Sequence, residues 1–166
     1  MIDDFRIGKT LGQGYSAKVK LAMRAGDDKK YALKILKLGG KISQRQIDDL
    51  LVKEDAAIKQ LKHRSVVRYY GCRAEAVYSK KNGTQQRVTY MIFEYLPHGD
   101  MFSMVAGKGA FSENVVRVLA AELLTVTHYI NCSGLAHRDL KLENIMLDSN
   151  YDMRIVDLGF ACAIQG

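Results

Sequence analysis

The pattern of hydrophobic and polar positions divides the chain into a strand-rich first part and a mainly helical second part. In the first part, short runs of apolar, aromatic and β-branched residues are separated by glycine and polar turns, which is typical of antiparallel strands. The turn at Gly26 and the Asn82-Gly83 pair are suited to close two hairpins. The strands are predicted over residues 5–11, 18–24, 30–36, 67–78 and 87–95.

A helix is predicted between the third and fourth strands. Ser43 and Gln46 have the spacing of a capping box, in which each side chain binds the backbone N–H of the other residue. Glu54 falls on the apolar stripe of this helix, where a carboxylate is costly unless it has a partner. The stripe consists of Ile47, Leu50, Leu51, Ile58 and Leu61.

Lys34 is the natural partner for Glu54. It lies in the third predicted strand, and alternation places it on one face with Ala32 and Leu36, so its ammonium group projects among apolar neighbours. Pairing with Glu54 would hold this ammonium group toward a phosphate. Two alternatives remain open, a lysine that extends its charge to solvent from an edge strand and a helix with a wide polar shoulder around Glu54.

The pattern changes at a linker that contains Pro97, the only proline of the chain. Beyond it, a long amphipathic helix is predicted from residue 112 to residue 132, followed by two short apolar runs at 144–147 and 153–156. The predicted fold class is α+β, with a five-stranded antiparallel sheet and one helix before a mainly helical part. The predicted domains are residues 1–95 for the sheet and its helix, 96–100 for the linker and 101–166 for the helical part.

Composition and charge exclude several classes of protein. The 166 residues are 48% hydrophobic and 26% charged, which is ordinary for a globular protein and unlike a disordered one. The net charge of +7 is spread along the chain without a dense basic block, which argues against nucleic acid as a partner. Arg117 and Glu122 interrupt the longest candidate for a membrane span, and the first residues lack the features of a signal peptide. A soluble, cytoplasmic protein that does not bind a membrane is expected.

A glycine-containing turn lies between the first two predicted strands. Gly12 and Gly14 would let the tip of this hairpin approach a ligand closely, so that its backbone N–H groups cover phosphates. An ordinary hairpin tolerates the same pair of glycines. The segment is not a dinucleotide-binding fingerprint, because no helix directly follows it.

The densest group of reactive side chains is the segment HRDLKLEN, residues 137–144. Its spacing suits phosphoryl transfer, because Asp139 would orient an attacking hydroxyl, Lys141 would neutralise charge on the moving phosphoryl group and Asn144 would bind a metal. Asp157 follows across one predicted hairpin, in the sequence Asp-Leu-Gly, and offers a hard oxygen ligand for Mg²⁺. A solvated polar loop is the alternative for residues 137–144.

Together, these segments resemble the motifs of eukaryotic protein kinases of the serine/threonine type, in the right order from Phe5 to the end of the chain. They are most similar to the calmodulin-dependent and AMP-activated-kinase-related group. The resemblance implies an enzyme that uses ATP and Mg²⁺ to phosphorylate a serine or threonine hydroxyl of a protein. Asp100 and Glu143 occupy positions that grip an upstream arginine in basophilic members, which implies a basic peptide substrate.

The resemblance also assigns roles to individual residues. Asp139 would be the catalytic base, assisted by Lys141, and Lys34 paired with Glu54 would contact the α- and β-phosphates. The implied magnesium ligands are Asn144 and Asp157, and the implied nucleotide-binding residues are Leu11, Gly12, Gly14, Val19, Ala32, Lys34, Phe93, Glu94, Leu96 and Met146.

Two departures from the family pattern stand out. Leu158 replaces a phenylalanine, and would still pack with Ile58 and His137 in the apolar spine of an active kinase. The chain ends seven residues after Gly159, so a truncated kinase domain with a weakly stable second part is expected. Two functions stay open, a serine/threonine kinase present as a partial catalytic domain, and a non-catalytic nucleotide-binding module that regulates or docks on another kinase.

Overall fold

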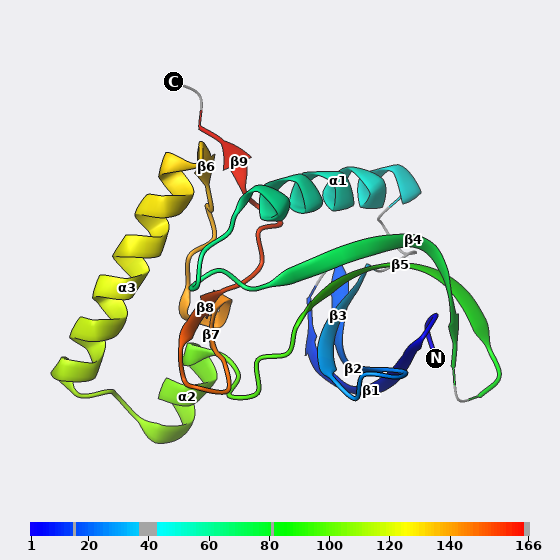
Figure 1. The fold of residues 1–166 in the computed structure, drawn as a ribbon, viewed down its shortest axis with the longest axis horizontal. Helices are drawn as coiled ribbons and strands as arrows, with labels where there is room; N and C mark the ends of the chain where they lie inside the picture. The colour runs from blue at the N-terminus through cyan, green and yellow to red at the C-terminus, as the bar shows by residue number, and fades with distance from the viewer. Residues whose placement is uncertain (15, 37–42, 81, 165–166) are drawn as a thin grey trace. The chain divides into compact units, whose positions relative to one another are not determined.

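The chain folds into two units, Met1–Val52 with Arg68–Tyr95 and Lys53–Val67 with Leu96–Gly166 (Figure 1). The structure is a computed structural model that describes residues 1–14, 16–36, 43–80 and 82–164. Each unit has its own buried residues and its own hydrogen-bonded strands.

The first unit is built on a five-stranded antiparallel sheet, in the strand order β1-β2-β3-β5-β4 among the residues described. The predicted α+β fold with such a sheet is therefore confirmed. Most predicted strand ends agree with the structure to within about two residues, as expected where turns rather than side-chain patterns set the ends. The strands are β1 (Phe5–Gln13), β2 (Ala17–Arg24), β3 (Lys30–Leu36), β4 (Tyr69–Ser79) and β5 (Gln85–Glu94).

The residues before β1 link the two edge strands of the sheet. Ile2 forms antiparallel bridges to Phe5 in β1 and to Tyr78 in β4, and the Ser79 N–H donates to the Met1 carbonyl at 2.9 Å. The short segment thus lies between β1 and β4, whose edges would otherwise expose unpaired backbone groups. The side chain of Ile2 is 0% exposed, so this segment also contributes to the core.

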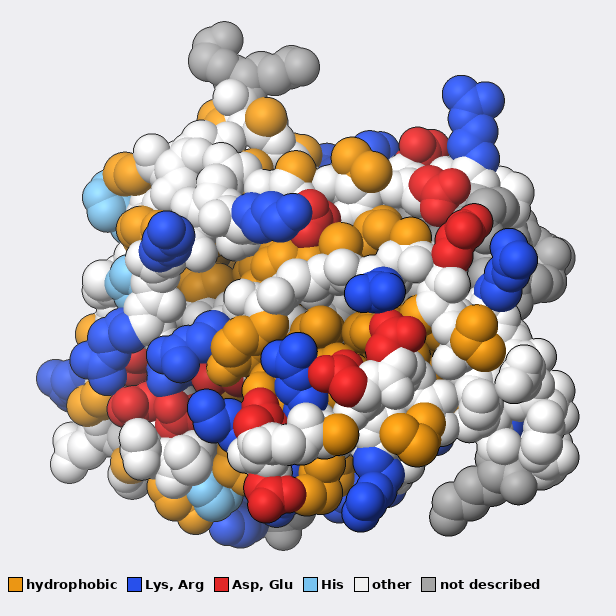
Figure 2. Space-filling view, turned by 45° about the vertical axis from the view of Figure 1, so that its right-hand side comes forward, with side chains coloured by type: hydrophobic (Ala, Val, Ile, Leu, Met, Phe, Trp, Pro, Cys, Tyr) orange, Lys and Arg blue, Asp and Glu red, His pale blue; other side chains and the backbone are white. Residues whose placement is uncertain are grey.

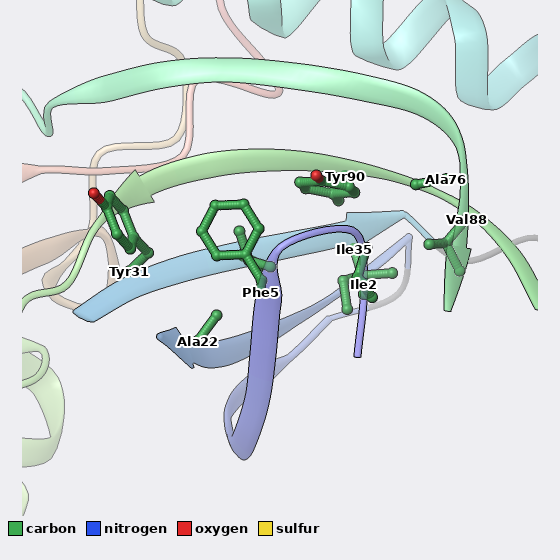
Figure 3. Close-up of a cluster of buried hydrophobic side chains, with 9 residues drawn as sticks. Ile2, Phe5, Ala22, Tyr31, Ile35, Ala76, Val88 and Tyr90 are labelled. Carbon is green, nitrogen blue, oxygen red and sulfur yellow. The ribbon is translucent and has the colours of Figure 1, made fainter. Parts of the chain in front are cut away.

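The core of the first unit lies within the curl of the sheet (Figure 3). Alternation along β3 sends Tyr31, Leu33 and Ile35 into it and leaves Lys34 on the opposite face, as the sequence predicts. The ring of Phe5 packs edge-on against Tyr31, with ring centroids 5.5 Å apart. The cluster consists of Ile2, Phe5, Ala22, Tyr31, Leu33, Ile35, Ala76, Val88 and Tyr90.

Helix α1 (Gln44–Gln60) begins with the predicted capping box. The Ser43 N–H donates to Oε1 of Gln46 at 2.9 Å, and the Gln46 N–H donates to Oγ of Ser43 at 3.3 Å. The stripe that contains Leu51 and Ile58 is buried, and Glu54 on the same stripe is only 4% exposed. The burial of Glu54 disfavours the alternative of a wide polar shoulder, and its pairing with Lys34 stays a prediction.

Among its described residues, the second unit contains the end of α1, two further α-helices and two small antiparallel sheets. Helix α2 was not predicted, because it is short, contains Gly107 and follows directly on the linker. Its start is fixed by Asp100, whose carboxylate accepts from the N–H of Ser103 at 2.7 Å. The elements are α2 (Met101–Lys108), α3 (Glu113–Cys132), β6 (Leu135–Ala136), the 3₁₀ turn η1 (Leu142–Asn144), β7 (Ile145–Leu147), β8 (Met153–Ile155) and β9 (Cys162–Ala163).

Helix α3 has the predicted length, but its apolar stripe is only partly covered. Val126 and Ile130 near its C-terminal end are buried, whereas Val115 and Val116 near its start are 43% and 48% exposed. Side-chain pattern alone gives the direction of an apolar stripe, and packing partners decide which part of it is buried.

The loop that follows α1 is tied to two elements of the second unit. The backbone N–H of Lys62 donates to the hydroxyl of Tyr129 at 2.7 Å, and Oγ of Ser65 donates to Glu122 at 2.6 Å, both on α3. The same loop pairs with β8, where the Ile155 N–H donates to the Ser65 carbonyl at 2.8 Å. The end of α1 is thereby held against α3 and β8.

The surface carries charges of both signs. On the face that Figure 2 displays, Lys and Arg side chains are interspersed with Asp and Glu. Across the ranges that the structure describes, no helix combines the length and the apolar composition that crossing a membrane requires.

Replacing Ile2 by alanine should destabilise the first unit, because it empties a fully buried position that joins both edges of the sheet. The expected loss is about 2–5 kcal/mol in the free energy of unfolding, measured by urea denaturation. Val52→Ala, at a position that is 64% exposed, is the control and should change this energy by less than about 0.5 kcal/mol. Equal effects of the two substitutions would show that the Ile2 side chain does not contribute to the core.

Candidate active site

The carboxylate of Asp139 is held by two neighbouring side chains. Nζ of Lys141 donates to both of its oxygens, at 3.0 and 2.8 Å, and Nδ2 of Asn144 donates to its Oδ2 at 2.8 Å. The hydrogen bond to Asp139 raises the pKa of Lys141 above its ordinary value of 10.5, so Lys141 is a cation at neutral pH. The loop therefore presents a fixed carboxylate with a positive charge beside it.

The buried ring of His137 joins this loop to the strand that precedes Asp157. Its Nδ1 accepts from the Asp139 N–H at 3.3 Å, and its Nε2 lies 3.2 Å from the carbonyl of Val156. Burial lowers the pKa of His137 below its ordinary 6.5, which favours the neutral ring with its proton on Nε2. His137, Ile58 and Leu158, the three predicted spine residues, are all buried in the second unit.

Asn144 directly precedes β7, and Asp157 follows β8 after Val156. Both residues therefore lie at the end of the β7–β8 hairpin that is opposite its turn. The Val156 N–H donates to the Asn144 carbonyl at 3.0 Å, so Asn144 is paired with the residue that precedes Asp157. Both N–H groups of the Asn144 side-chain amide donate to Asp139, one to its backbone carbonyl and one to its carboxylate, each at 2.8 Å. Met146, the predicted adenine contact, lies in β7 and is half-buried.

The donor set fits Mg²⁺. A carboxylate and an amide oxygen are hard ligands, and Mg²⁺ in phosphate-binding sites usually takes one or two protein oxygens, with phosphate oxygens and water completing its shell. Within the part of the chain that the structure describes, no group of three or more His, Cys, Asp or Glu side chains could hold a metal by itself. Asn144 and Asp157 are thus suited to a metal that arrives with a phosphate ligand.

In the first unit, strand register gathers four of the predicted nucleotide-binding residues on one face of the sheet. Val19 in β2 is paired with Lys34 in β3, and Ala32 in β3 is paired with Phe93 in β5. Residues paired across antiparallel strands share a face, and so do residues two apart on one strand. Val19, Ala32 and Lys34 therefore lie on the face opposite the hydrophobic core, in adjacent rows.

The glycine turn stands at the end of this face. Gly12 is paired with Val19, and the Gly14 N–H donates to the Ala17 carbonyl at 3.0 Å, which closes the tip of the β1–β2 hairpin. A side chain built at Gly12 would meet nothing within 4 Å, so open space adjoins its backbone. Leu11 beside it is 38% exposed.

The remaining predicted residues belong to the segment that leads out of the sheet. Glu94 ends β5, where its N–H donates to the Arg68 carbonyl at 3.0 Å and its carboxylate accepts from the Arg68 N–H at 2.7 Å. Leu96 is buried in the second unit. The structure thus gathers the predicted residues into two sets, one in each unit, and the meeting of the two sets around one nucleotide stays a prediction.

Sequence reasoning missed a buried ion pair beside the site. Asp148 and Arg154 face each other across the turn between β7 and β8, with side chains 10% and 14% exposed. The sequence signal was present, since Asp148, Asn150 and Asp152 are turn formers, but it predicts a turn and not a buried charge.

Comparison with known proteins agrees with this arrangement. The family pattern described as "Protein kinase domain" matches residues 5–166. CBL-interacting protein kinase 21 of Oryza sativa subsp. japonica is 35% identical over 161 residues, which are 97% of this chain and 29% of that protein. SNF1-related protein kinase catalytic subunit alpha KIN12 of Arabidopsis thaliana is 33% identical over 161 residues, 97% of this chain and 30% of that protein.

A third relative, CBL-interacting serine/threonine-protein kinase 17 of Arabidopsis thaliana, is 32% identical over 164 residues, 99% of this chain and 35% of that protein. The chain thus spans about a third of the length of the curated relatives it matches. These relatives are serine/threonine kinases of the AMP-activated-kinase-related group that the sequence resembles. The chain belongs to the protein kinase domain family.

Proposed function

We propose that this chain carries the ATP-binding and phosphoryl-transfer residues of a serine/threonine protein kinase. The observation that carries the proposal is the geometry around Asp139, whose carboxylate is fixed by Lys141 and by Asn144 at hydrogen-bond distance. A carboxylate, a cation and a metal-ligating amide at one point are the parts that phosphoryl transfer requires.

In the proposed reaction, Asp139 accepts the proton of the substrate serine or threonine hydroxyl. The hydroxyl oxygen forms a bond to the γ-phosphorus of ATP, the bond from that phosphorus to the bridging oxygen breaks, and ADP leaves. Lys141, a cation beside Asp139, stabilises the negative charge on the transferred group. Its hydrogen bonds to Asp139 hold the two side chains together at this point.

The nucleotide is proposed to bind against the sheet face that bears Val19, Ala32 and Lys34. The aliphatic side chains would cover the adenine ring together with Met146, and Phe93 would close the back of this pocket. Glu94 and Leu96 would offer backbone bonds to the ring, and Leu11, Gly12 and Gly14 would cover the nucleotide from the hairpin.

Lys34 is proposed to contact the α- and β-phosphates while paired with Glu54. The burial of Glu54, which is 4% exposed on the apolar stripe of α1, supports this pairing because a buried carboxylate requires a partner. Asn144 and Asp157 would hold Mg²⁺, which neutralises phosphate charge when bound.

Asp139→Asn should abolish transfer while leaving binding of MgATP unchanged, because the carboxylate acts on the hydroxyl and not on the nucleotide. The expected loss is at least about 100-fold in the rate of peptide phosphorylation. Fluorescent ATP analogues measure binding to the full chain, and Asp49→Asn on the exposed side of α1 is the control. Full turnover by Asp139→Asn would refute the role of the base. Binding of MgATP without transfer by the unaltered chain would instead support the non-catalytic module.

The substrate is proposed to be basic upstream of the target hydroxyl, with Asp100 and Glu143 as its acceptors. Asp100 also caps α2, and its second carboxylate oxygen accepts from Oγ of Ser103 at 2.9 Å. Asp100→Asn keeps a good capping residue and removes the charge. It should lower the preference for upstream arginine by about tenfold in kcat/KM, as expected for one charged hydrogen bond, without unfolding α2. The preference is measured with an oriented peptide library. If neither the unaltered chain nor the Asp100→Asn variant prefers an upstream arginine, this substrate class is contradicted.

The pKa of His137 in the folded chain should lie below its ordinary value of 6.5, because burial disfavours the charged ring. The group therefore contributes its full stability above pH 6.5, and the contribution is lost as pH falls through the folded-state pKa. Nitrogen-15 NMR of the imidazole ring measures the protonation state, and the neutral form should carry its proton on Nε2. A pKa at or above 6.5 in the folded chain would contradict the bridging role of His137.

A further inference from the structure

The hairpin of β7 and β8 sets the distance between the two proposed metal ligands. Its register pairs Ile145 with Ile155, and the bond from the Val156 N–H to the Asn144 carbonyl extends the pairing to the position of Asn144. Asp157 directly follows Val156 along the chain. Because each strand has only three residues, the backbone ladder is short and specifies the register weakly.

The closed end of the hairpin is held by the carboxylate of Asp148. Its Oδ1 accepts from the N–H groups of Asn150 and Asp152, at 2.8 and 3.0 Å. The backbone N–H of Asp148 donates to the Asp152 carbonyl at 3.0 Å, and the N–H of Tyr151 donates to the Asp148 carbonyl at 3.1 Å. One residue thus organises the whole turn.

The other oxygen of Asp148 is bound by Arg154 in β8. The guanidinium NH2 donates to Oδ2 at 2.5 Å, and NH1 donates to the carbonyl of Met153 at 3.1 Å. Both side chains are nearly buried, at 10% and 14% exposure. A pair in this environment is screened little by solvent, so a shifted register would leave a charge buried without its partner.

We propose that Asp148 and Arg154 are positioning residues for the metal site. They act through the hairpin, because the register that they hold places Asn144 and Asp157 at neighbouring points for one Mg²⁺ ion. The inference rests on the proposed function, in that it assigns these residues to the same ATP and Mg²⁺ site. Neither side chain is needed for contact with substrate, since the bonds of the Asp148 carboxylate lie within its own turn and to Arg154.

The test measures two affinities separately in the full chain. Asp148→Asn keeps an acceptor for the turn N–H groups and removes the charge, and Arg154→Met removes the charge from the other side. Both variants should bind Mn²⁺ in the presence of ADP about 10- to 100-fold more weakly, by electron paramagnetic resonance, the loss typical of residues that orient metal ligands. Their affinity for ADP without metal should be unchanged. Arg154→Lys should recover part of the metal affinity.

A matched control lies at the same turn. Arg64 and Asp152 form an exposed pair at 3.3 Å, with side chains 69% and 41% exposed, and Arg64→Met should leave the Mn²⁺ affinity unchanged. NMR contacts between Ile145 and Ile155 report the register independently of any ligand, and they also show whether each variant is folded.

The outcomes separate this inference from the proposed function. If the unaltered chain binds no metal with ADP, both are overturned. If the unaltered chain binds Mn²⁺ and the variants bind it equally well, the inference alone is overturned. A shifted register with unchanged metal affinity overturns it as well. Should Asp148→Asn fail to fold, the comparison of Arg154→Met with Arg154→Lys decides.

Discussion

Side chains on an antiparallel strand alternate between the two faces of a sheet, so a shift of one residue exchanges the faces. In the first unit, such a shift of β3 would bury Lys34 in the core and turn Tyr31 and Leu33 outward. In the second unit, it would separate Asn144 from the residue that precedes Asp157. Strand register is therefore the constraint on which both halves of the proposed site depend, and the two units secure it differently.

The five-stranded sheet secures its register by burial. Nine buried side chains form its core, and a slip of β3 by one residue would exchange Tyr31, Leu33 and Ile35 for Ala32, Lys34 and Leu36. The β7–β8 hairpin has no comparable length, so specific polar bonds around Asp148 take that role. Arg117 and Glu113 form an exposed ion pair, with side chains 73% and 85% exposed. Such surface pairs contribute only about 0–1 kcal/mol to stability, unlike the nearly buried pair of Asp148 and Arg154. Removing one partner of a buried pair costs about 3–5 kcal/mol.

Much of the fold could be predicted from the sequence, because local chemistry dictates it. Runs of apolar, aromatic and β-branched residues between turn signals predicted the described strands of the large sheet, and the capping box of Ser43 and Gln46 predicted the start of α1. The burial of Glu54 followed from its place on an apolar stripe. Helix α2 and the two-residue strands β6 and β9 were missed, because elements this short are stabilised by tertiary contacts and leave no periodic signal.

The candidate site likewise has a part that local sequence predicts and a part that it does not. Short-range spacing predicted the cluster of Asp139, Lys141 and Asn144, whose members lie within six residues of one another and do meet in space. The assignment of distant residues such as Lys34 depended on family resemblance, since nothing local connects a strand lysine to a loop more than 100 residues later. The pair of Asp148 and Arg154 was missed for another reason, namely that burial of a polar turn depends on what packs around it.

Backbone strain marks the same part of the second unit. Arg138 and Asp157 both have positive φ, at 65° and 61°, a region that non-glycine residues adopt at a cost of about 1–3 kcal/mol. Such conformations persist only where surrounding bonds determine them. Nε of Arg138 donates to the Phe160 carbonyl at 2.7 Å, and the neighbouring ring of His137 binds the backbone on both sides. Arg138 directly precedes the proposed base Asp139, and Asp157 is itself a proposed metal ligand, so the strained backbone lies at the two carboxylates of the proposed site.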